Sequence, residues 1–133
     1  MQSRTILLGL FFLLATGMAS VAQPQQAANA PAGIMTQKVK NATVFAGGRG
    51  LTLYTYDNDV GGKPSCYDFC ARTWLPLLTG KDAMVPANWS LVARNDGSTQ
   101  MAYKGKPLYF FTGDNPGEMS GDGMNNLWHA AKP

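Results

Sequence analysis

Cys66 and Cys70 are the only cysteines in the chain and could form a disulfide or act as a redox-active pair. In an exported protein, two thiols this close favour a disulfide, because compartments outside the cytoplasm are oxidising. Redox-active pairs usually have Cys-x-x-Cys spacing at the start of a helix, whereas this chain has three residues between its cysteines. We therefore expect a structural disulfide that stabilises the fold by only about 2 kcal/mol, with a redox role as the alternative.

Met119, Met124 and His129 near the C-terminus could bind a metal ion. Thioether and imidazole ligands suit copper or a haem iron. The sequence has no Cys-x-x-Cys-His motif for covalent haem, and methionine commonly fills irregular space in a hydrophobic core. We expect these residues to be packing or surface residues and expect no cofactor. A copper or haem site is the alternative.

An acidic segment from Asp57 to Asp68 superficially fits a twelve-residue calcium loop. The fit is poor, because Gly61 offers no side-chain oxygen at the fifth position and Pro64 stiffens the centre. A second acidic, glycine-containing loop holds Asp114, Glu118 and Asp122. Turn formation explains these residues better than calcium binding does.

The chain has no catalytic motif with a defining spacing. It contains one histidine and lacks Gly-x-Ser-x-Gly, His-Glu-x-x-His and a glycine-rich phosphate loop before a helix. We therefore do not expect an enzyme.

Aromatic side chains are numerous and could form either a binding face or the core. On an exposed face they could stack on a quinone, a sugar or a peptide. Inside the domain they would replace the few isoleucines and leucines, and this is the role we expect. The set comprises Tyr54, Tyr56, Tyr67, Trp74, Trp89, Tyr103, Tyr109 and Trp128.

Residues 1–22 have the pattern of a secretory signal peptide. Arg4 precedes an apolar stretch over residues 6–15, which is too short to span a membrane, and small residues lead to a cleavage site after Ala22. No cysteine near that site can accept a lipid, so we expect no stable membrane anchor after cleavage. Residues 23–35 are rich in Gln, Ala, Asn and Pro and predict a disordered linker. The expected location is periplasmic or secreted.

The length of the chain leaves room for one small domain, and its low charge argues against a nucleic-acid-binding protein. The chain has 133 residues, which after removal of the leader is enough for one small domain. Its formal net charge of +3 comes from 11 basic and 8 acidic residues, so it has no basic arm for nucleic acid.

Short apolar runs separated by glycine, asparagine and aspartate predict strands rather than helices. Residues 39–45 predict a first strand, residues 47–50 a glycine turn and residues 51–56 a second strand. A three-stranded meander is predicted over residues 89–94, 99–103 and 107–111. We therefore predict an all-β, mainly antiparallel domain over residues 36–133, with a short helical turn near the cysteine pair.

The pattern Gly-x-x-Leu-Tyr-x-aromatic-x-x-Asp occurs twice, at residues 50–59 and 105–114. Strand periodicity places Tyr54 and Tyr56 on one face and Leu53 on the other, so both faces are suited to burial. When a gap of one residue is allowed in this alignment, Trp128 of the second copy also aligns with Trp74 of the first. The sequence predicts two repeat units at about residues 42–79 and 97–133.

Asp59 and Asp114 end the two copies, where the chain must turn. A carboxylate there can accept backbone N–H groups from the following loop, or a tyrosine hydroxyl. The candidate structural or binding residues of the repeat are Tyr54, Tyr56, Asp59, Tyr109, Phe111, Asp114, Trp74 and Trp128.

These residues resemble the bacterial secreted-repeat proteins, many of them predicted lipoproteins, which share the pattern Tyr-x-(Phe/Trp/Tyr)-x-x-Asp. The resemblance covers residues 44–133 and includes the family's Cys-x-Gly-x-Cys-Ala-x-x-Trp-Pro-Pro segment, where this chain has Asp68 for the glycine and Leu75 for the first proline. It also lacks the cysteine that lipoprotein members use for lipid attachment. The resemblance implies a repeat fold and little about activity, because the family's biochemical role is not established.

The sequence as a whole predicts an exported, non-catalytic module of the cell envelope that binds an unidentified envelope protein or small ligand. The alternative is a periplasmic electron-transfer or metal-handling protein that uses the methionines and histidine, or the cysteine pair.

Overall fold

The structure is a computed structural model that describes residue 17 and residues 29–133. The predicted signal peptide and the predicted linker lie outside the described residues, except for Gly17 and residues 29–35. None of the helices in the described part of the chain has the length and apolar composition needed to cross a membrane.

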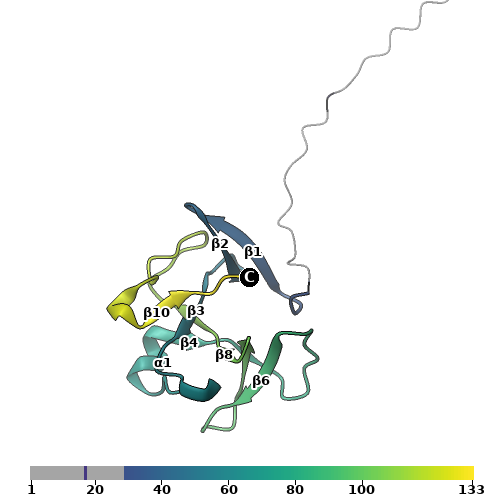
Figure 1. The fold of residues 1–133 in the computed structure, drawn as a ribbon, viewed down its shortest axis with the longest axis vertical. Helices are drawn as coiled ribbons and strands as arrows, with labels where there is room; N and C mark the ends of the chain where they lie inside the picture. The colour runs from purple at the N-terminus through teal and green to yellow at the C-terminus, as the bar shows by residue number, and fades with distance from the viewer. Residues whose placement is uncertain (1–16, 18–28) are drawn as a thin grey trace, which may run out of the picture.

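The described chain consists mainly of short antiparallel strands, which confirms the predicted all-β class (Figure 1). The strands are β1 (Ile34–Val39), β2 (Ala42–Gly47), β3 (Leu53–Tyr56), β4 (Trp74–Pro76), β5 (Leu78–Thr79), β6 (Trp89–Ala93), β7 (Thr99–Tyr103), β8 (Lys106–Pro107), β9 (Tyr109–Phe111) and β10 (Trp128–Ala130). The helical turns are η1 (Val60–Gly62), α1 (Phe69–Thr73) and η2 (Met124–Asn126). Because α1 contains Cys70, a helical turn does lie near the cysteine pair.

A four-stranded sheet with the order β10-β3-β9-β4 forms the centre of the domain. Its middle strands, β3 and β9, pair so that Tyr54 lies opposite Tyr109, and these are equivalent residues of the two repeats. The two outer strand pairs are also equivalent. Trp128 of β10 lies opposite Tyr56 of β3, and Trp74 of β4 lies opposite Phe111 of β9. A local two-fold axis therefore passes between β3 and β9 and relates the two repeats.

Each repeat also contributes one hairpin. The β1–β2 hairpin pairs Ile34 with Gly47, and the β6–β7 hairpin pairs Trp89 with Tyr103. Each unit thus consists of a hairpin, a central strand, a loop and an outer strand of the central sheet. These units start at β1 and β6, earlier in the chain than the predicted repeat boundaries.

The prediction of one strand over residues 39–45 is wrong. The chain reverses after Val39 at Lys40 and Asn41, and Lys40 has a left-handed φ of 53°. Such turns usually contain glycine, so lysine gave no turn signal in the sequence. The strand before this turn begins at Ile34, inside the predicted linker, because Ile34 is only 3% exposed and belongs to the core.

The predicted strand over residues 107–111 is divided between two sheets. β8 pairs with β7, whereas β9 pairs with β3 and β4. The change occurs at Leu108, which is fully buried and whose backbone bonds to both Met101 and Leu77. This crossing joins the second hairpin to the central sheet.

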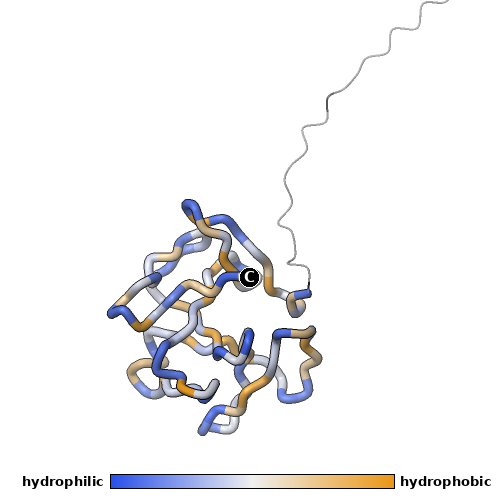
Figure 2. The backbone as a smooth tube through the Cα atoms, viewed as in Figure 1, coloured by the Kyte–Doolittle hydropathy of each residue, from blue (hydrophilic) through white to orange (hydrophobic). Residues whose placement is uncertain are grey.

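Two hydrophobic clusters cover the two faces of the central sheet, as the strand periodicity predicts. The hairpins supply Phe45, Trp89 and Met101 to the first cluster, which contains Leu53 and Leu108. The second cluster contains Tyr54, Tyr109, Trp74, Trp128 and Cys66. In Figure 2 the polar residues, in blue, gather at turns on the outside of the domain.

Asp68 has a backbone conformation that suits glycine. Its φ and ψ are 53° and −120°, and its side chain makes no capping bond at the start of α1. Replacing Asp68 by glycine is expected to raise the free energy of unfolding by about 1 kcal/mol, because glycine adopts this conformation without the strain of a Cβ atom. Urea unfolding of both proteins with the disulfide intact measures the change; an equal or lower stability of the glycine variant would contradict it.

Candidate functional site

Four aromatic rings form a continuous stack along one face of the central sheet. Trp74 and Trp128 are at its middle, with ring centroids 3.8 Å apart and planes at 2°. Tyr56 stacks on Trp128 at 4.1 Å, and Phe111 stacks on Trp74 at 4.6 Å. Equivalent residues of the two repeats therefore meet at the local two-fold axis.

Tyr54 and Tyr109 pack edge-on against the two tryptophans of this stack. Tyr54 contacts Trp74 edge-on and Tyr109 contacts Trp128 edge-on, each at 5.2 Å between ring centroids. Both tyrosines are fully buried. Trp74 and Trp128 are buried with them, as expected of core residues, whereas Tyr56 and Phe111 at the two ends of the stack are only partly buried.

Each tyrosine hydroxyl bonds to the aspartate of the other repeat. The Tyr109 hydroxyl donates to Asp59 Oδ2 at 2.8 Å, and the Tyr54 hydroxyl donates to Asp114 Oδ2. The sequence suggested a tyrosine partner for these aspartates but could not identify which tyrosine. The exchange ties the two repeats together through two polar contacts as well as through the stack.

The second oxygen of each aspartate holds the loop that follows it. Asp59 Oδ1 accepts hydrogen bonds from the backbone N–H and the hydroxyl of Ser65, both at 2.8 Å. Asp114 Oδ1 accepts the same two bonds from Ser120, with the N–H at 2.8 Å. The two serines were not identified as site residues, although their matching positions in the repeat were visible in the sequence.

Burial, followed by the hydrogen bond to a carboxylate, raises the pKa of Tyr54 and of Tyr109 above the usual value. The unfolded chain loses these protons near pH 10 while the folded chain keeps them, so stability is present below pH 10 and falls above it. We expect a loss of about 1.4 kcal/mol per pH unit for each hydroxyl above pH 10. Stability measured from pH 8 to 11 should show a weaker pH dependence in the Y54F/Y109F variant; identical slopes would contradict this assignment.

The disulfide loop lies against a buried arginine. Cys66 and Cys70 are bonded, with an S–S distance of 2.00 Å, and Cys66 is fully buried. Arg94 is 5% exposed; its Nη2 donates to the Cys66 carbonyl and its Nη1 to Gln100, each at 2.7 Å. The guanidinium also lies over the Tyr67 ring. Sequence reasoning did not identify Arg94 as buried, because a charged residue next to a turn is typical of a surface.

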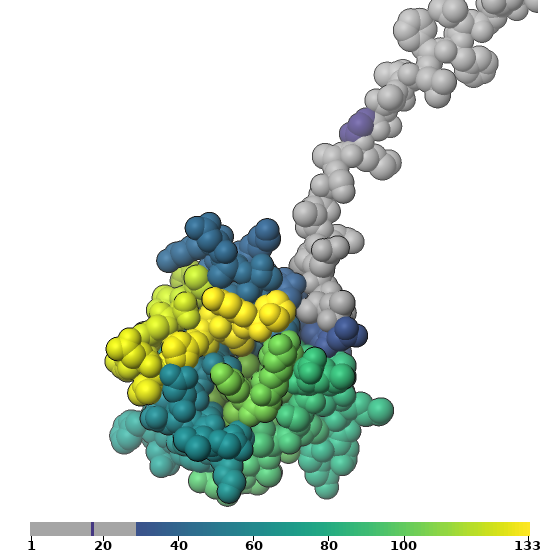
Figure 3. Space-filling model, in the orientation of Figure 1, coloured from purple at the N-terminus to yellow at the C-terminus, as the bar shows by residue number. Residues whose placement is uncertain are grey.

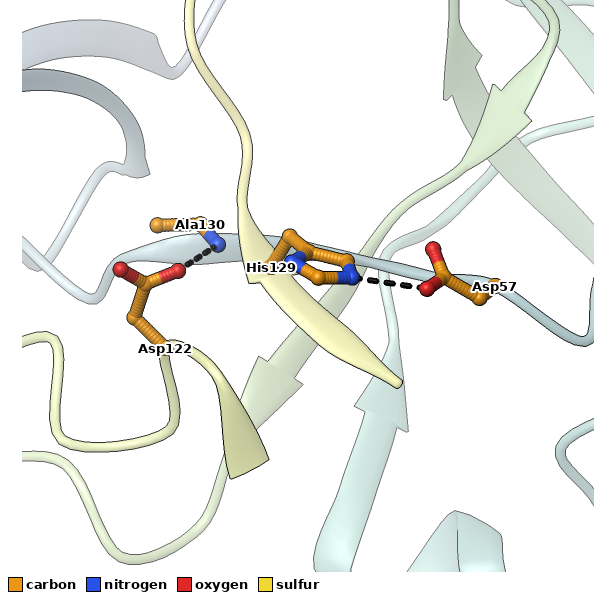
Figure 4. A network of polar contacts seen from close by, with 4 residues as sticks. All are labelled: Asp57, Asp122, His129 and Ala130. Atoms are coloured by element: carbon orange, nitrogen blue, oxygen red, sulfur yellow. Dashed lines mark hydrogen bonds and ion pairs between the residues drawn. The ribbon is translucent and has the colours of Figure 1, made fainter. Parts of the chain in front are cut away.

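The candidate metal ligands are distributed over different environments. His129 contacts Asp57 at 2.8 Å, and both side chains are about half exposed (Figure 4). Met119 and Met124 pack against the second hydrophobic cluster. Within residues 29–133, no three His, Cys, Asp or Glu side chains come together as a metal site requires. In the first acidic segment, Asp57 pairs with His129, and Asp59 bonds to Tyr109 and Ser65.

A surface groove of about 580 Å³ lies beside β9 and the edge strand β4. Its apolar lining includes Leu51, Leu75, Phe110 and Pro116, and its cationic residue is Arg49. Leu75 is 45% exposed. The lining also includes Phe111 and Asp114, which were predicted from the sequence as candidate residues of the repeat. The other lining residues were not predicted, because the sequence does not show that the turn after β2 reaches β9.

Comparison with known protein families supports the internal repeat. A family model described as a secreted repeat of unknown function matches the chain twice, over residues 35–78 and 90–132. These ranges begin close to β1 and β6, where the structural units begin. No curated protein and no solved structure matches the chain.

Proposed function

The chain belongs to the family of secreted repeats of unknown function, and from the groove described above we propose that it is an exported, non-catalytic binding module for a small apolar molecule with one acidic group. We place its site in the groove beside β9 and β4. The observation that carries the proposal is the size and apolar lining of that groove, which suit a ligand with two or three rings.

The floor of the groove is held in place before any ligand binds. A Cβ atom at Gly47 would lie 2.8 Å from the Phe110 ring, so glycine is needed for this close approach of β2 to β9. The Phe110 ring thus packs closely against β2 on one side. A rigid apolar floor favours binding, because little conformational entropy is lost when the ligand is seated.

Arg49 supplies the groove with one cationic group that can meet an acidic group of the ligand. Arg49 lies in the lining, whereas the carboxylate of Asp114 is already bonded to Tyr54 and Ser120. An anionic group near the guanidinium would gain a charge-assisted hydrogen bond.

Fluorescence titration with anilinonaphthalene sulfonate tests the proposal, since this probe combines aromatic rings with one anionic group. We expect saturable binding by the purified protein and at least about tenfold weaker binding by the Leu75→Asp variant, because a carboxylate in the apolar groove would have to be desolvated. The matched control is Leu78→Asp, since Leu78 is similarly exposed, at 52%, but lies outside the groove.

The neutral analogue phenylnaphthylamine separates the two parts of the proposal. We expect it to bind more weakly than the sulfonate probe, and we expect the Arg49→Gln variant to lose that preference. Equal binding by the Leu75→Asp and Leu78→Asp variants, or no saturable binding by the wild type, would overturn the proposal.

A further inference from the structure

A second groove is lined in part by residues that the local two-fold axis relates to residues of the first groove. In the first groove, Leu51 and Phe110 come from the turn region before β3 and from β9. Their equivalents, Lys106 and Thr55, line a second groove of about 280 Å³, which lies between β8, β3 and the C-terminal segment. The two grooves share no lining residue.

The second groove is more polar and more positively charged than the first. At equivalent positions the leucine is replaced by a lysine and the phenylalanine by a threonine. Lys104 and Lys132 add two further ammonium groups to the second groove. In Figure 3 the yellow C-terminal segment, which supplies Lys132, lies beside the green segment that contains β8.

The positive charge of the second groove is largely unneutralised. Asp122 is the one acidic residue in its lining, and one of its carboxylate oxygens accepts the N–H of Ala130 at 2.8 Å. Among residues 29–133, the three lysines form no ion pair. Lys104 lies with its ammonium group 5.2 Å from the centre of the Tyr103 ring.

The backbone around these lysines is well supported. The Lys104 N–H donates to the Asn88 carbonyl at 2.7 Å. A Cβ atom at Gly62 would lie 2.7 Å from the Gly105 carbonyl oxygen, so η1 packs closely on the turn before β8. The turn thus carries its lysine on a fixed backbone, as a binding site requires.

We propose that this second groove binds the phosphate group of an anionic ligand. Phosphate carries up to two negative charges and several acceptor oxygens, and these match separate lysine ammonium groups, each of which acts as a compact point charge. A carboxylate has one charge and would leave more of the lysine repulsion uncompensated. The site is independent of the apolar groove, so either proposal can fail without the other.

Calorimetric titration of the full-length mature protein with inorganic pyrophosphate at low ionic strength tests the site. We expect saturable binding that the Lys106→Gln/Lys132→Gln variant weakens at least about tenfold. The control variant, Lys38→Gln/Lys81→Gln, removes the same charge from exposed positions outside the groove and should change the affinity by less than about twofold. Binding should weaken as salt is added.

A second titration uses vesicles of phosphatidylcholine with and without phosphatidylglycerol and distinguishes the two sources of phosphate. Lysine-dependent binding of pyrophosphate identifies a soluble phosphorylated ligand, and lysine-dependent binding of the anionic vesicles alone identifies a lipid headgroup. Both results support the proposal. It is overturned if neither probe binds, or if the two double variants lose affinity equally.

Discussion

Replacing Trp74 by alanine is expected to lower the free energy of unfolding by about 3–5 kcal/mol, the range for a large aromatic residue removed from a core. Trp74 is 4% exposed and touches Trp128, Phe111 and Tyr54 through its ring. Its removal would leave a cavity at the centre of the second cluster and would remove the ring contact between Trp74 and Trp128, one of the contacts that join the two repeats.

The equivalent replacement of Trp128 should cost a similar amount, because its contacts with Tyr56, Tyr109 and Trp74 repeat the same pattern. Chemical denaturation followed by far-ultraviolet circular dichroism measures both losses. Tryptophan-to-phenylalanine variants are the controls and should cost less, since they keep part of the stack. A loss below about 1 kcal/mol for either alanine variant would contradict the stacked core.

Alanine at Asp59 or Asp114 should also destabilise the domain, by about 1–3 kcal/mol in each case. Each carboxylate accepts three hydrogen bonds, one from a buried tyrosine of the other repeat and two from a serine of its own loop. Without the carboxylate, the buried hydroxyl and the serine N–H lose their acceptor, and an unsatisfied buried donor carries the full cost of its desolvation.

Asp96 offers a matched control for these two aspartates. Its carboxylate accepts the N–H and the hydroxyl of Ser98, the same pair of groups that a serine supplies in each repeat. It lies in an exposed turn, however, where the hydrogen bonds from Ser98 lower its pKa and no tyrosine is bonded to it. Asp96→Ala should therefore cost clearly less than either motif variant. Equal losses in all three variants would show that the tyrosine bonds add nothing to stability.

The sequence predicted the parts of the fold that depend on local pattern. Strand alternation at Leu53 and Tyr54 correctly assigned these neighbours to opposite faces, and the repeated aromatic pattern indicated two related units. The turn at Lys40 was missed because it lacks the glycine that usually marks such a turn. The break at Leu108 was missed because an apolar residue between two strand segments has the same pattern as a continuous strand.

The candidate site depends on contacts that are distant in the chain and could be predicted only in part. Asp59 and Asp114 were identified as loop-holding residues, but the exchange of their tyrosine partners follows from how β3 and β9 pair, which no local pattern encodes. The buried position of Arg94 likewise results from its meeting the Cys66 carbonyl and Gln100. The two grooves arise where turns of one repeat meet strands of the other.

A pair of double-mutant cycles tests the central claim, which is that each tyrosine hydroxyl bonds to the aspartate of the other repeat and so joins the two repeats. The first cycle combines Asp59→Ala with Tyr109→Phe, and the second combines Asp59→Ala with Tyr54→Phe. We predict a coupling free energy of about 1–2 kcal/mol for the first cycle and a value near zero for the second. Coupling between Asp59 and Tyr54, with none between Asp59 and Tyr109, would mean that each repeat is closed on itself and would contradict the account.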